Sequence, residues 1–370
     1  MKSCVRGYNR TEKVEGAGDG AFCIVRTRSG KGWEECTVRP WKTLFPDAAG
    51  RRKLMRVDNR KVALIGTGMV GMSYAYAMLN QSACDELVLI DVNRLRAEGE
   101  AMDLNHGLAF APSNMKIYAG DYGDCEDADI VVICAGVAQK EGETRLDLLK
   151  RNAAVFQSIV DPVTASGFNG FFLVATNPVD IMTRITCDLS GFNPRRVLGT
   201  GTTLDTARLR YLLGGYLNAD PRNVHAYVIG EHGDSEFVPW SQAMLATKPI
   251  LSLCGETGGR NICREELDQI AEEVRSAAYR IIEAKNATYY GIGMALTRIT
   301  KAILGDEHSV LTVSAMLKGE YGQSGVFAGV PCIINKNGIQ SVLTLSLTEE
   351  ELNHLSSSCE TLRESYEGIL

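Results

Sequence analysis

The stretch "KVALIGTGMVG" at residues 61–71 decides the fold class. A short apolar run leads into Gly66, Gly68 and Gly71, spaced G-x-G-x-x-G, and a segment with helical spacing follows directly. Between a strand and a helix, the first glycine allows a tight turn, the second lets the backbone approach a pyrophosphate, and the third lets helix and strand pack closely. A helix-packing turn without a ligand would use similar glycines, so the surrounding sequence must decide between the two readings.

The end of the next apolar run supplies that context. "ELVLID" (residues 86–91) ends in Asp91, twenty residues beyond Gly71. A carboxylate at this position accepts hydrogen bonds from an adenosine ribose and repels a 2′-phosphate. We therefore expect NAD, rather than NADP, as the cofactor.

Strand-like and helix-like segments alternate through the first half of the chain. The strand candidates are "KVALIG", "ELVLID", "MKIYAG", "ADIVVICAG" and "GFFLVAT", with helical spacing over residues 69–82, 93–110 and 144–167. This alternation predicts an α/β fold with a Rossmann-type, doubly wound parallel sheet over residues 55–201. Residues 202–370 mix strand candidates (224–230, 310–319, 330–339) with helical segments (264–286, 348–366), which indicates a second domain of mixed α+β type.

Composition excludes several classes of partner. No apolar run approaches the ~18 residues that a membrane-spanning helix needs. The eleven cysteines form no CxxC pair, so we expect no metal site and mostly reduced, buried cysteines in a cytosolic protein. Residues 1–54 carry a net charge of +6, and since the whole chain carries −6, residues 55–370 carry −12. Because residues 55–370 are this acidic, they would bind nucleic acid poorly.

Residues 1–54 differ from the rest of the chain. They are rich in glycine and charge without a sustained period, so we expect an extra segment that lacks regular structure. A regulatory or targeting arm is an alternative, although the segment has too many acidic residues for a good mitochondrial presequence. A third hypothesis is an over-called start: Arg51–Arg52 can be encoded by AGGAGG, a bacterial ribosome-binding sequence, upstream of Met55. The codons of those arginines would test it.

Two short segments carry candidates for redox chemistry on a carbonyl, which needs a proton donor, a stabiliser of the oxyanion and an anchor for the substrate. "LDTARLR" (204–210) places Asp205 and Arg208 on a probable helix, and "IGEHGDS" (229–235) places His232 in a glycine-flanked turn. On these facts alone, a solvated salt bridge and an exposed loop histidine explain the residues better than a catalytic site does.

The order of the motifs resembles that of bacterial L-lactate dehydrogenases. These motifs are "GTGMVG", "MDLNHG", "AGVAQKEGETR", "ATNPVD", "LDTARLR", "GEHGDS" and "ATYYGIG", and the likeness runs from about Arg60 to the C-terminus. One small departure is Ala287, where the family often has glycine. The resemblance implies a cytoplasmic homotetramer that reduces pyruvate reversibly to L-lactate with NADH, in glycolysis and fermentation.

The same resemblance implies roles for individual residues. His232 would protonate the carbonyl as hydride arrives, Asp205 would orient its imidazole, and Arg208 would grip the substrate carboxylate with two parallel bonds. On the mobile loop "VAQKEGETR" (137–145), Gln139 would face the variable group of the substrate and Arg145 would stabilise the developing oxyanion.

Further residues complete the implied sites. Asn177 and Thr288 would line the substrate pocket, and the Asn177–Pro178 bond is a candidate for the cis form. Cofactor contacts are implied for Gly66, Gly68, Val70, Gly71, Asp91, Arg96, Tyr122, Gly136, Val137, Ser158, Ala175, Thr176, Asn177 and Thr200.

The resemblance also implies an allosteric site, because Arg210 and His225 match positions that bind the activator fructose 1,6-bisphosphate between subunits of allosteric bacterial L-lactate dehydrogenases. On a helix, side chains two residues apart point about 200° apart, so Arg208 can face the active site while Arg210 faces away from it. We therefore expect this allosteric site in a tetramer.

Three other functions remain open. Malate dehydrogenases share the acid–base pair but carry arginine where this chain has Gln139, and Lys140 is adjacent. A neutral residue leaves the second carboxylate of oxaloacetate unpaired, which disfavours that substrate. A branched-chain 2-hydroxyacid dehydrogenase would need a wider pocket, and a non-catalytic NAD-binding protein would not need the four ionisable residues.

Overall fold

The computed structural model describes residues 60–137, 145–253 and 263–368, together with the backbone of three strands nearer the N-terminus. The chain separates into two units, Met1–Asn59 and Arg60–Leu370. Gln139 therefore lies outside the described residues, and Arg145 is described only as the first residue of a helix.

The N-terminal unit contains an antiparallel sheet of β1 (Asn9–Val14), β2 (Phe22–Ser29) and β3 (Gly32–Pro40). This corrects the expectation that the segment lacks regular elements. The overlooked signal is the density of β-branched and aromatic residues in "FCIVRTRS" and "GWEECTVRP", which favour strands even when charges interrupt the alternation.

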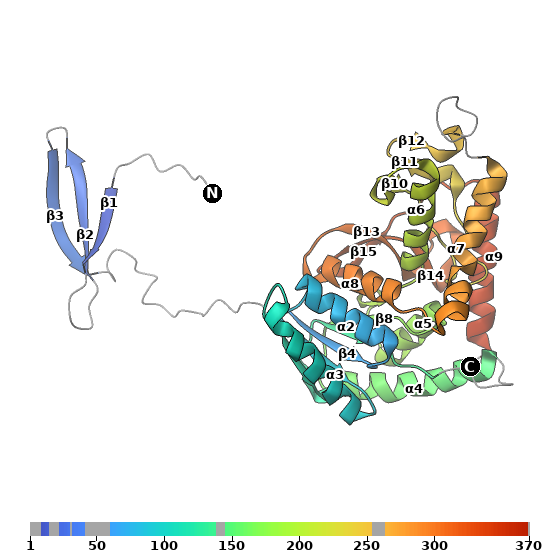
Figure 1. Ribbon diagram of the computed structural model, residues 1–370, viewed down its shortest axis with the longest axis horizontal. Helices are drawn as coiled ribbons and strands as arrows, with labels where there is room; N and C mark the ends of the chain where they lie inside the picture. The colour runs from blue at the N-terminus through green and yellow to red at the C-terminus, as the bar shows by residue number, and fades with distance from the viewer. Residues whose placement is uncertain are drawn as a thin grey trace. The chain divides into compact units, whose positions relative to one another are not determined.

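The second unit is built on one sheet, which has nine strands within the described residues and the order β15-β14-β13-β9-β8-β7-β4-β5-β6 (Figure 1). Its parallel part comprises β4 (Lys61–Ile65), β5 (Glu86–Ile90), β6 (Lys116–Ala119), β7 (Ile130–Ile133), β8 (Phe171–Val174) and β9 (Val197–Gly199). β4, β5 and β7 are buried along their whole length, as expected for strands covered on both faces. This confirms the predicted Rossmann-type sheet.

Antiparallel strands extend this sheet into the second half of the chain. They are β13 (Ser309–Lys318), β14 (Ser324–Asn335) and β15 (Gly338–Val342). β13 joins the parallel part by pairing Ser314 with Gly199 of β9. The single strand expected over 330–339 is thus the hairpin between β14 and β15.

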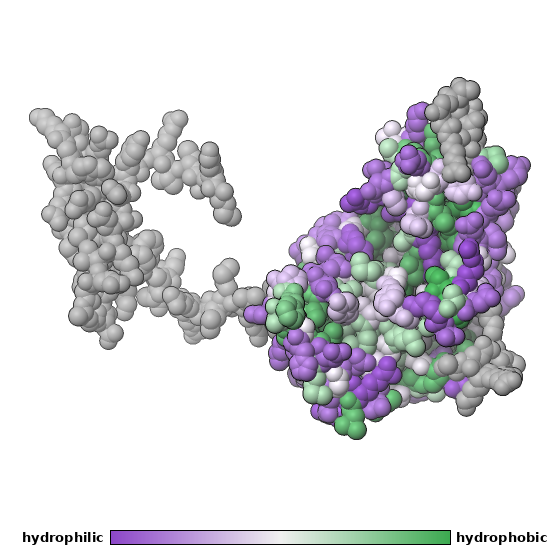
Figure 2. Space-filling model, in the orientation of Figure 1, coloured by the Kyte–Doolittle hydropathy of each residue, from purple (hydrophilic) through white to green (hydrophobic). Residues whose placement is uncertain are grey.

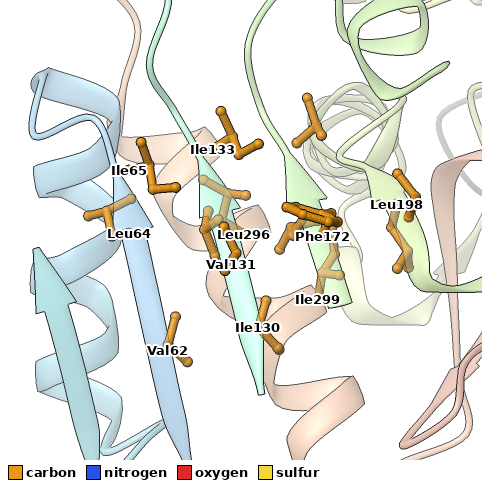
Figure 3. Close-up of a cluster of buried hydrophobic side chains, with 14 of the residues drawn as sticks. Val62, Leu64, Ile65, Ile130, Val131, Ile133, Phe172, Leu198, Leu296 and Ile299 are labelled. Carbon is orange, nitrogen blue, oxygen red and sulfur yellow. The ribbon is translucent and has the colours of Figure 1, made fainter. Parts of the chain in front are cut away.

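Helices cover the two faces of the parallel part. They are α2 (Met69–Gln81), α3 (Arg94–Gly107), α4 (Arg145–Ala165), α5 (Val179–Ser190) and α8 (Tyr290–Leu304). α2 packs against α8, and α4 packs against α5 (Figure 1). The side chains between the sheet and α8 form a continuous apolar cluster (Figure 3), in which each fully buried aliphatic residue contributes roughly 1.5–3 kcal/mol.

The second half has a smaller core of its own. It lies among α6 (Thr203–Leu217), α7 (Arg264–Lys285) and the small sheet of β10 (Val224–His225), β11 (Met244–Leu245) and β12 (Lys248–Pro249). The strand expected over 224–230 is shortened to β10. The last helix is α9 (Glu349–Glu367), which begins at a Thr348 capping box.

Two expectations from composition can be compared with this structure. Among the described residues, no helix has the length and apolar content that a membrane crossing requires. Of the seven described cysteines, all free, five are buried, Cys134 is half-buried and Cys263 is exposed.

Candidate active site

The three glycines of the opening motif have different surroundings. Gly66 has φ +100°, and a Cβ there would lie 2.5 Å from the backbone nitrogen of Ala135. A Cβ on Gly71 would lie 2.0 Å from the carbonyl oxygen of Gly66, so this glycine lets α2 approach β4. A Cβ on Gly68, the N-cap of α2, would meet no described atom within 4 Å. The second glycine therefore faces open space at a helix N-terminus, where N–H groups favour phosphate.

A cavity of about 320 Å³ lies at this end of the sheet. It is bounded by the carboxyl ends of β4, β5 and β7, next to the point where the strand order reverses, which is the usual ligand position in open α/β sheets. The expected cofactor residues that line it are Gly66, Gly68, Asp91, Arg96, Tyr122, Gly136, Val137 and Ser158. The chemistry of this lining fits a dinucleotide: glycine backbone for phosphates, one carboxylate for a ribose and apolar walls for a base.

Asp91 also organises the turn itself. Its Oδ2 accepts hydrogen bonds from the Thr67 backbone N–H at 2.8 Å and the Thr67 hydroxyl at 3.0 Å, and Oδ1 accepts from Asn93 N–H at 2.9 Å. Burial alone would raise the pKa of Asp91, but these hydrogen bonds outweigh it and lower the pKa. The carboxylate is therefore charged at neutral pH, and it supports the fold as well as facing the cavity.

The other expected cofactor residues do not line this cavity. Val70 and Gly71 lie in the first turn of α2, and Ala175, Thr176, Asn177 and Thr200 follow β8 and β9 at the same edge of the sheet. The Thr176 hydroxyl donates to Ala135 O at 2.7 Å, and Thr200 N–H donates to Val174 O at 2.9 Å. These bonds tie the ends of neighbouring strands together.

His232 lies in a turn that is held at both sides. Ile229 pairs with Phe237 across the turn, and Gly230 pairs with Gly329 of β14. The His232 Nδ1 atom lies 2.6 Å from Asp205 Oδ2, in the first turn of α6. Its Nε2 atom forms no hydrogen bond with a described residue, so it is available to a ligand.

Arg208 completes this group. Its Nη1 donates to Asp205 Oδ1 at 2.7 Å, so one buried carboxylate, with 2% of its side chain exposed, serves both the histidine and the arginine. Burial favours a neutral Asp205, but His232 and Arg208 outweigh it and lower the pKa of that carboxyl. The pair at i, i+3 is thus a buried charge pair, not a solvated one.

The same charges act on His232. Burial would lower the pKa of the imidazole, but the charge of Asp205 and its hydrogen bond outweigh burial and raise the pKa to about 9. The histidine therefore holds a proton at neutral pH. A protonated imidazole with a free Nε2–H, beside an arginine, can donate a proton to a bound carbonyl.

Sequence reasoning missed two carboxyl groups of this site. Asp180 accepts the His232 backbone N–H at 2.8 Å and the Ser314 hydroxyl, and burial raises its pKa to about 6. Glu236 lies with Oε2 3.9 Å from His232 Nδ1. Both belong to quoted or adjacent stretches, "ATNPVD" and the residues after "GEHGDS", but nothing local in the sequence shows that they converge.

The group formed by Asp205, His232 and Glu236 places one potential metal-ligand atom of each residue within 4.8 Å of the others. Asp205, however, is already bonded through both oxygens, to His232 and to Arg208. An acid–base pair with an anion anchor accounts for this pairing directly.

The remaining expected substrate residues are less fully placed. Gln139 and the side chain of Arg145 lie outside the described residues. Asn177 is exposed after β8 and precedes a cis bond to Pro178, and Thr288 is half-buried between α7 and α8. Neither makes a hydrogen bond to the group of Asp205, Arg208 and His232 among the described residues.

Arg210 and Arg208 point to different surroundings, as helical geometry predicts. Arg210 Nε donates to Ala226 O at 3.1 Å, and its guanidinium lies 5.2 Å from the centre of the Tyr227 ring. Burial lowers the pKa of Arg210. His225, next to Ala226 in β10, is exposed.

Comparisons with known proteins agree with this geometry. The family model "lactate/malate dehydrogenase, NAD binding domain" matches residues 60–199, and "lactate/malate dehydrogenase, alpha/beta C-terminal domain" matches residues 202–370. The chain is 52% identical over 316 residues to L-lactate dehydrogenase 2 of Bacillus anthracis, covering 85% of this chain and 100% of the relative. It is 53% identical over 310 residues to L-lactate dehydrogenase of Oceanobacillus iheyensis, covering 84% and 96%.

Solved structures give the same result. A lactate dehydrogenase from a Medee basin deep-sea metagenome library, MGS-M5, superposes with a TM-score of 0.82 at 52% identity, covering 84% of this chain and 99% of the other. The minor L-lactate dehydrogenase of Enterococcus mundtii in its ligand-bound form gives 0.83 at 48% identity, covering 85% and 99%. The fold, the glycine-lined cavity and the buried His–Asp–Arg group are therefore those of a chain that belongs to the lactate/malate dehydrogenase family.

Proposed function

We propose that this protein is an NAD-dependent L-lactate dehydrogenase, which reduces pyruvate to (S)-lactate and catalyses the reverse reaction. The observation that carries the proposal is the buried arrangement in which Asp205 bonds both His232 and Arg208. This arrangement provides a proton donor beside a fixed cation. The relatives at 52–53% identity bear the name L-lactate dehydrogenase.

The residues divide the chemistry between them. The bound cofactor supplies or accepts the hydride. His232 gives the proton on Nε2 to the carbonyl oxygen of pyruvate, and in reverse it takes the hydroxyl proton of lactate. Asp205 stabilises the imidazolium, and the donors of Arg208 that do not bond Asp205 hold the substrate carboxylate.

The loop that includes Gln139 and Arg145 completes the proposal. Arg145 would polarise the carbonyl, and Asn177 and Thr288 would border the substrate. Gln139 would face the methyl group of pyruvate, where a malate dehydrogenase needs a cation.

Comparative kinetics test this function. We expect a far higher kcat/KM for pyruvate than for oxaloacetate or a branched 2-oxoacid, measured as loss of NADH absorbance. A preference for oxaloacetate would make the protein a malate dehydrogenase, and a preference for the branched acid would give it a wider pocket. If NADH is not oxidised with any of the three acids, the protein would be a non-catalytic NAD-binding protein instead.

We further infer a homotetramer. Several large apolar side chains are exposed on the neighbouring helices α2 and α8, among them Met69 (60% exposed), Tyr76 (63%) and Met294 (55%). Figure 2 shows pale green and white residues, mixed with purple hydrophilic ones, on the face where α2 and α8 lie side by side. Exposed apolar patches of this kind are typical of subunit interfaces. Sedimentation velocity would measure the assembly.

The most detailed part of the proposed function is activation by fructose 1,6-bisphosphate. Arg210 lies on α6 two residues beyond Arg208, and exposed His225 lies in β10, seven residues before His232. Two subunits that present these cations across a symmetry axis would form a cleft for a bisphosphate. A shift at that cleft could move Arg208 and His232.

Pyruvate saturation with and without the bisphosphate tests this site, for wild type and Arg210→Gln. We expect the bisphosphate to activate the wild type and to have a much weaker effect on Arg210→Gln. Identical wild-type curves with and without the ligand would exclude activation. Activation that survives in Arg210→Gln would place the site elsewhere.

A further inference from the structure

Glu236 is a buried carboxyl group for which the reaction described above has no role. It follows His232 by four residues in the turn closed by Ile229 and Phe237, and the whole residue is only 5% exposed. Its Oε2 lies 3.9 Å from His232 Nδ1, the nitrogen that also faces Asp205. Two carboxyl groups thus converge on one side of the imidazole, and the other nitrogen is left for substrate.

Glu236 also lines a cavity of about 510 Å³. This cavity lies among the 234–241 segment, α7 and the first turns of α9, and it is separate from the cofactor cavity. Glu236 therefore lies beside the imidazole and also belongs to the lining of a second cavity. A carboxyl group in that position can exchange its proton with this cavity, so the proton need not pass through the substrate site.

Charges from α6, from α7 and from its own turn act on Glu236. Asp205 and Arg208 face it from α6, His232 from its own turn and Arg275 from α7. The other charged or titratable groups that line the cavity are Asp234, Arg264, Asp268, Glu350, Glu351 and His354. Arg264 is paired with Asp268 at 3.6 Å, and Glu351 accepts hydrogen bonds from Ser241, so these groups have partners away from the imidazole.

We propose that Glu236 is a positioning residue for the acid–base pair: its carboxyl group, 3.9 Å from the His232 imidazole, strengthens the hold of His232 on its own proton when it ionises. The carboxyl thereby extends the pH range over which the imidazole stays protonated. The proposal rests on the proposed function for its kinetic consequence, but the electrostatic coupling itself needs no substrate.

The energetics of the pair support this role. Burial, followed by the charge of Asp205, raises the pKa of Glu236 to about 9, the same range to which Asp205 raises that of His232. Because the two groups lie within 4 Å, loss of the proton from Glu236 leaves a negative charge that favours the imidazolium. A glutamine at this position stays neutral at every pH. In Glu236→Gln, His232 should therefore lose its proton at lower pH than in the wild type.

The first experiment measures this coupling without any reaction. NMR titration of the holoenzyme labelled at its histidine side chains follows the imidazole of His232, which is assigned by loss of its signal in His232→Gln. We expect the midpoint to fall by about one pH unit or more in Glu236→Gln, the size expected for an opposite charge within 4–6 Å. An unchanged midpoint overturns the proposal.

The second experiment measures kcat/KM for pyruvate between pH 6 and 10. Glu236→Gln should match the wild type within about twofold at pH 6.5 and fall about tenfold below it at the alkaline end, as a one-unit shift requires. Glu236→Asp keeps an ionisable group, so it should retain part of the wild-type kcat/KM at alkaline pH. Equal losses at all pH values in Glu236→Gln would indicate a structural role and overturn the proposal.

A matched control separates this coupling from the general charge of the cavity. Asp268→Asn removes one negative charge from the same cavity, at an exposed position that pairs with Arg264. Its pH profile should equal that of the wild type, and a shift as large as that of Glu236→Gln would overturn the specific role of Glu236. If the wild type does not reduce pyruvate while the NMR midpoint still shifts, the proposed function fails and the coupling stands.

Discussion

The two halves of the Arg60–Leu370 unit prepare for their ligands in different ways. The first half, from Arg60 to the end of β9, presents mainly backbone groups to its ligand, from the glycines at the start of α2. Asp91 adds one carboxylate. The other half offers side chains, with Asp205, Arg208 and His232 bonded together in a buried group. A backbone site tolerates changes that leave the glycines intact, whereas a side-chain site depends on the charge and reach of single residues. Substitutions in each half can therefore test the contrast.

The largest effect is expected at Gln139. If one side chain decides the substrate, Gln139→Arg should shift the ratio of kcat/KM values from pyruvate toward oxaloacetate by several orders of magnitude, since unpaired buried charge is strongly rejected. Steady-state kinetics with both acids measure the ratio. Lys140→Arg, at the adjacent position, is the control and should leave the ratio nearly unchanged. Unaltered relative rates in Gln139→Arg would remove Gln139 from the specificity site.

The anchor is the next most sensitive position. Arg208→Lys keeps the charge but loses the forked geometry, which should weaken pyruvate binding by about 2–3 kcal/mol. The Michaelis constant for pyruvate should rise accordingly, while NADH binding, followed by fluorescence, stays close to the wild type. The difference between the two ligands would sharpen the contrast between the halves. A pyruvate Michaelis constant that barely moves would show that another cation holds the carboxylate.

The glycines of the backbone site should separate stability from binding. A Cβ at position 71 would lie 2.0 Å from the Gly66 carbonyl oxygen, so Gly71→Ala should destabilise the protein by about 1–3 kcal/mol or more. A Cβ at position 68 would meet no described atom within 4 Å, so Gly68→Ala should keep the Tm. Because this Cβ would fill space where the backbone is expected to approach the pyrophosphate, the variant should weaken NADH binding. Thermal unfolding and NADH titration of both variants give the comparison. Equal effects of the two substitutions on Tm would contradict the separate functions assigned to these glycines.

The smallest expected effect concerns Asp91. Asp91→Ala and Asp91→Asn should both relax the preference for NADH over NADPH, by roughly tenfold, because each removes the charge that repels a 2′-phosphate. Only the alanine variant should also lose stability, because asparagine keeps an acceptor for the Thr67 N–H. Turnover at saturating NADH should stay nearly intact in Asp91→Asn. An undiminished preference for NADH in both variants would mean that another group reads the ribose.

The sequence predicted the cofactor half well because its signals are local. The run from Lys61 to Gly71 contains strand, turn and helix start within eleven residues, and the alternation of the following segments defined the parallel sheet. His232, Asp205 and Arg208 were identified as candidates by their motifs, and the structure brings these three together.

The elements that were missed depend on distant parts of the chain. Asp180 and Glu236 converge on His232 from α5 and from the far side of its turn, and no short stretch of sequence indicates that meeting. The N-terminal strands were missed because charged residues interrupt their alternation, and the β14–β15 hairpin was read as one strand because its turn at Lys336–Asn337 is short.

The junction between β9 and β13 has a consequence for synthesis of the chain. β9 pairs with β8 along one edge. Its other edge pairs with Ser314 of β13, which is translated more than a hundred residues later. At ribosomal rates of roughly 5–20 residues per second, this edge stays unpaired on the order of ten seconds. During that interval the nascent cofactor half presents an open strand edge to other chains. Chaperone dependence of the newborn chain should therefore peak after residue 199 and end once β13 has left the ribosome.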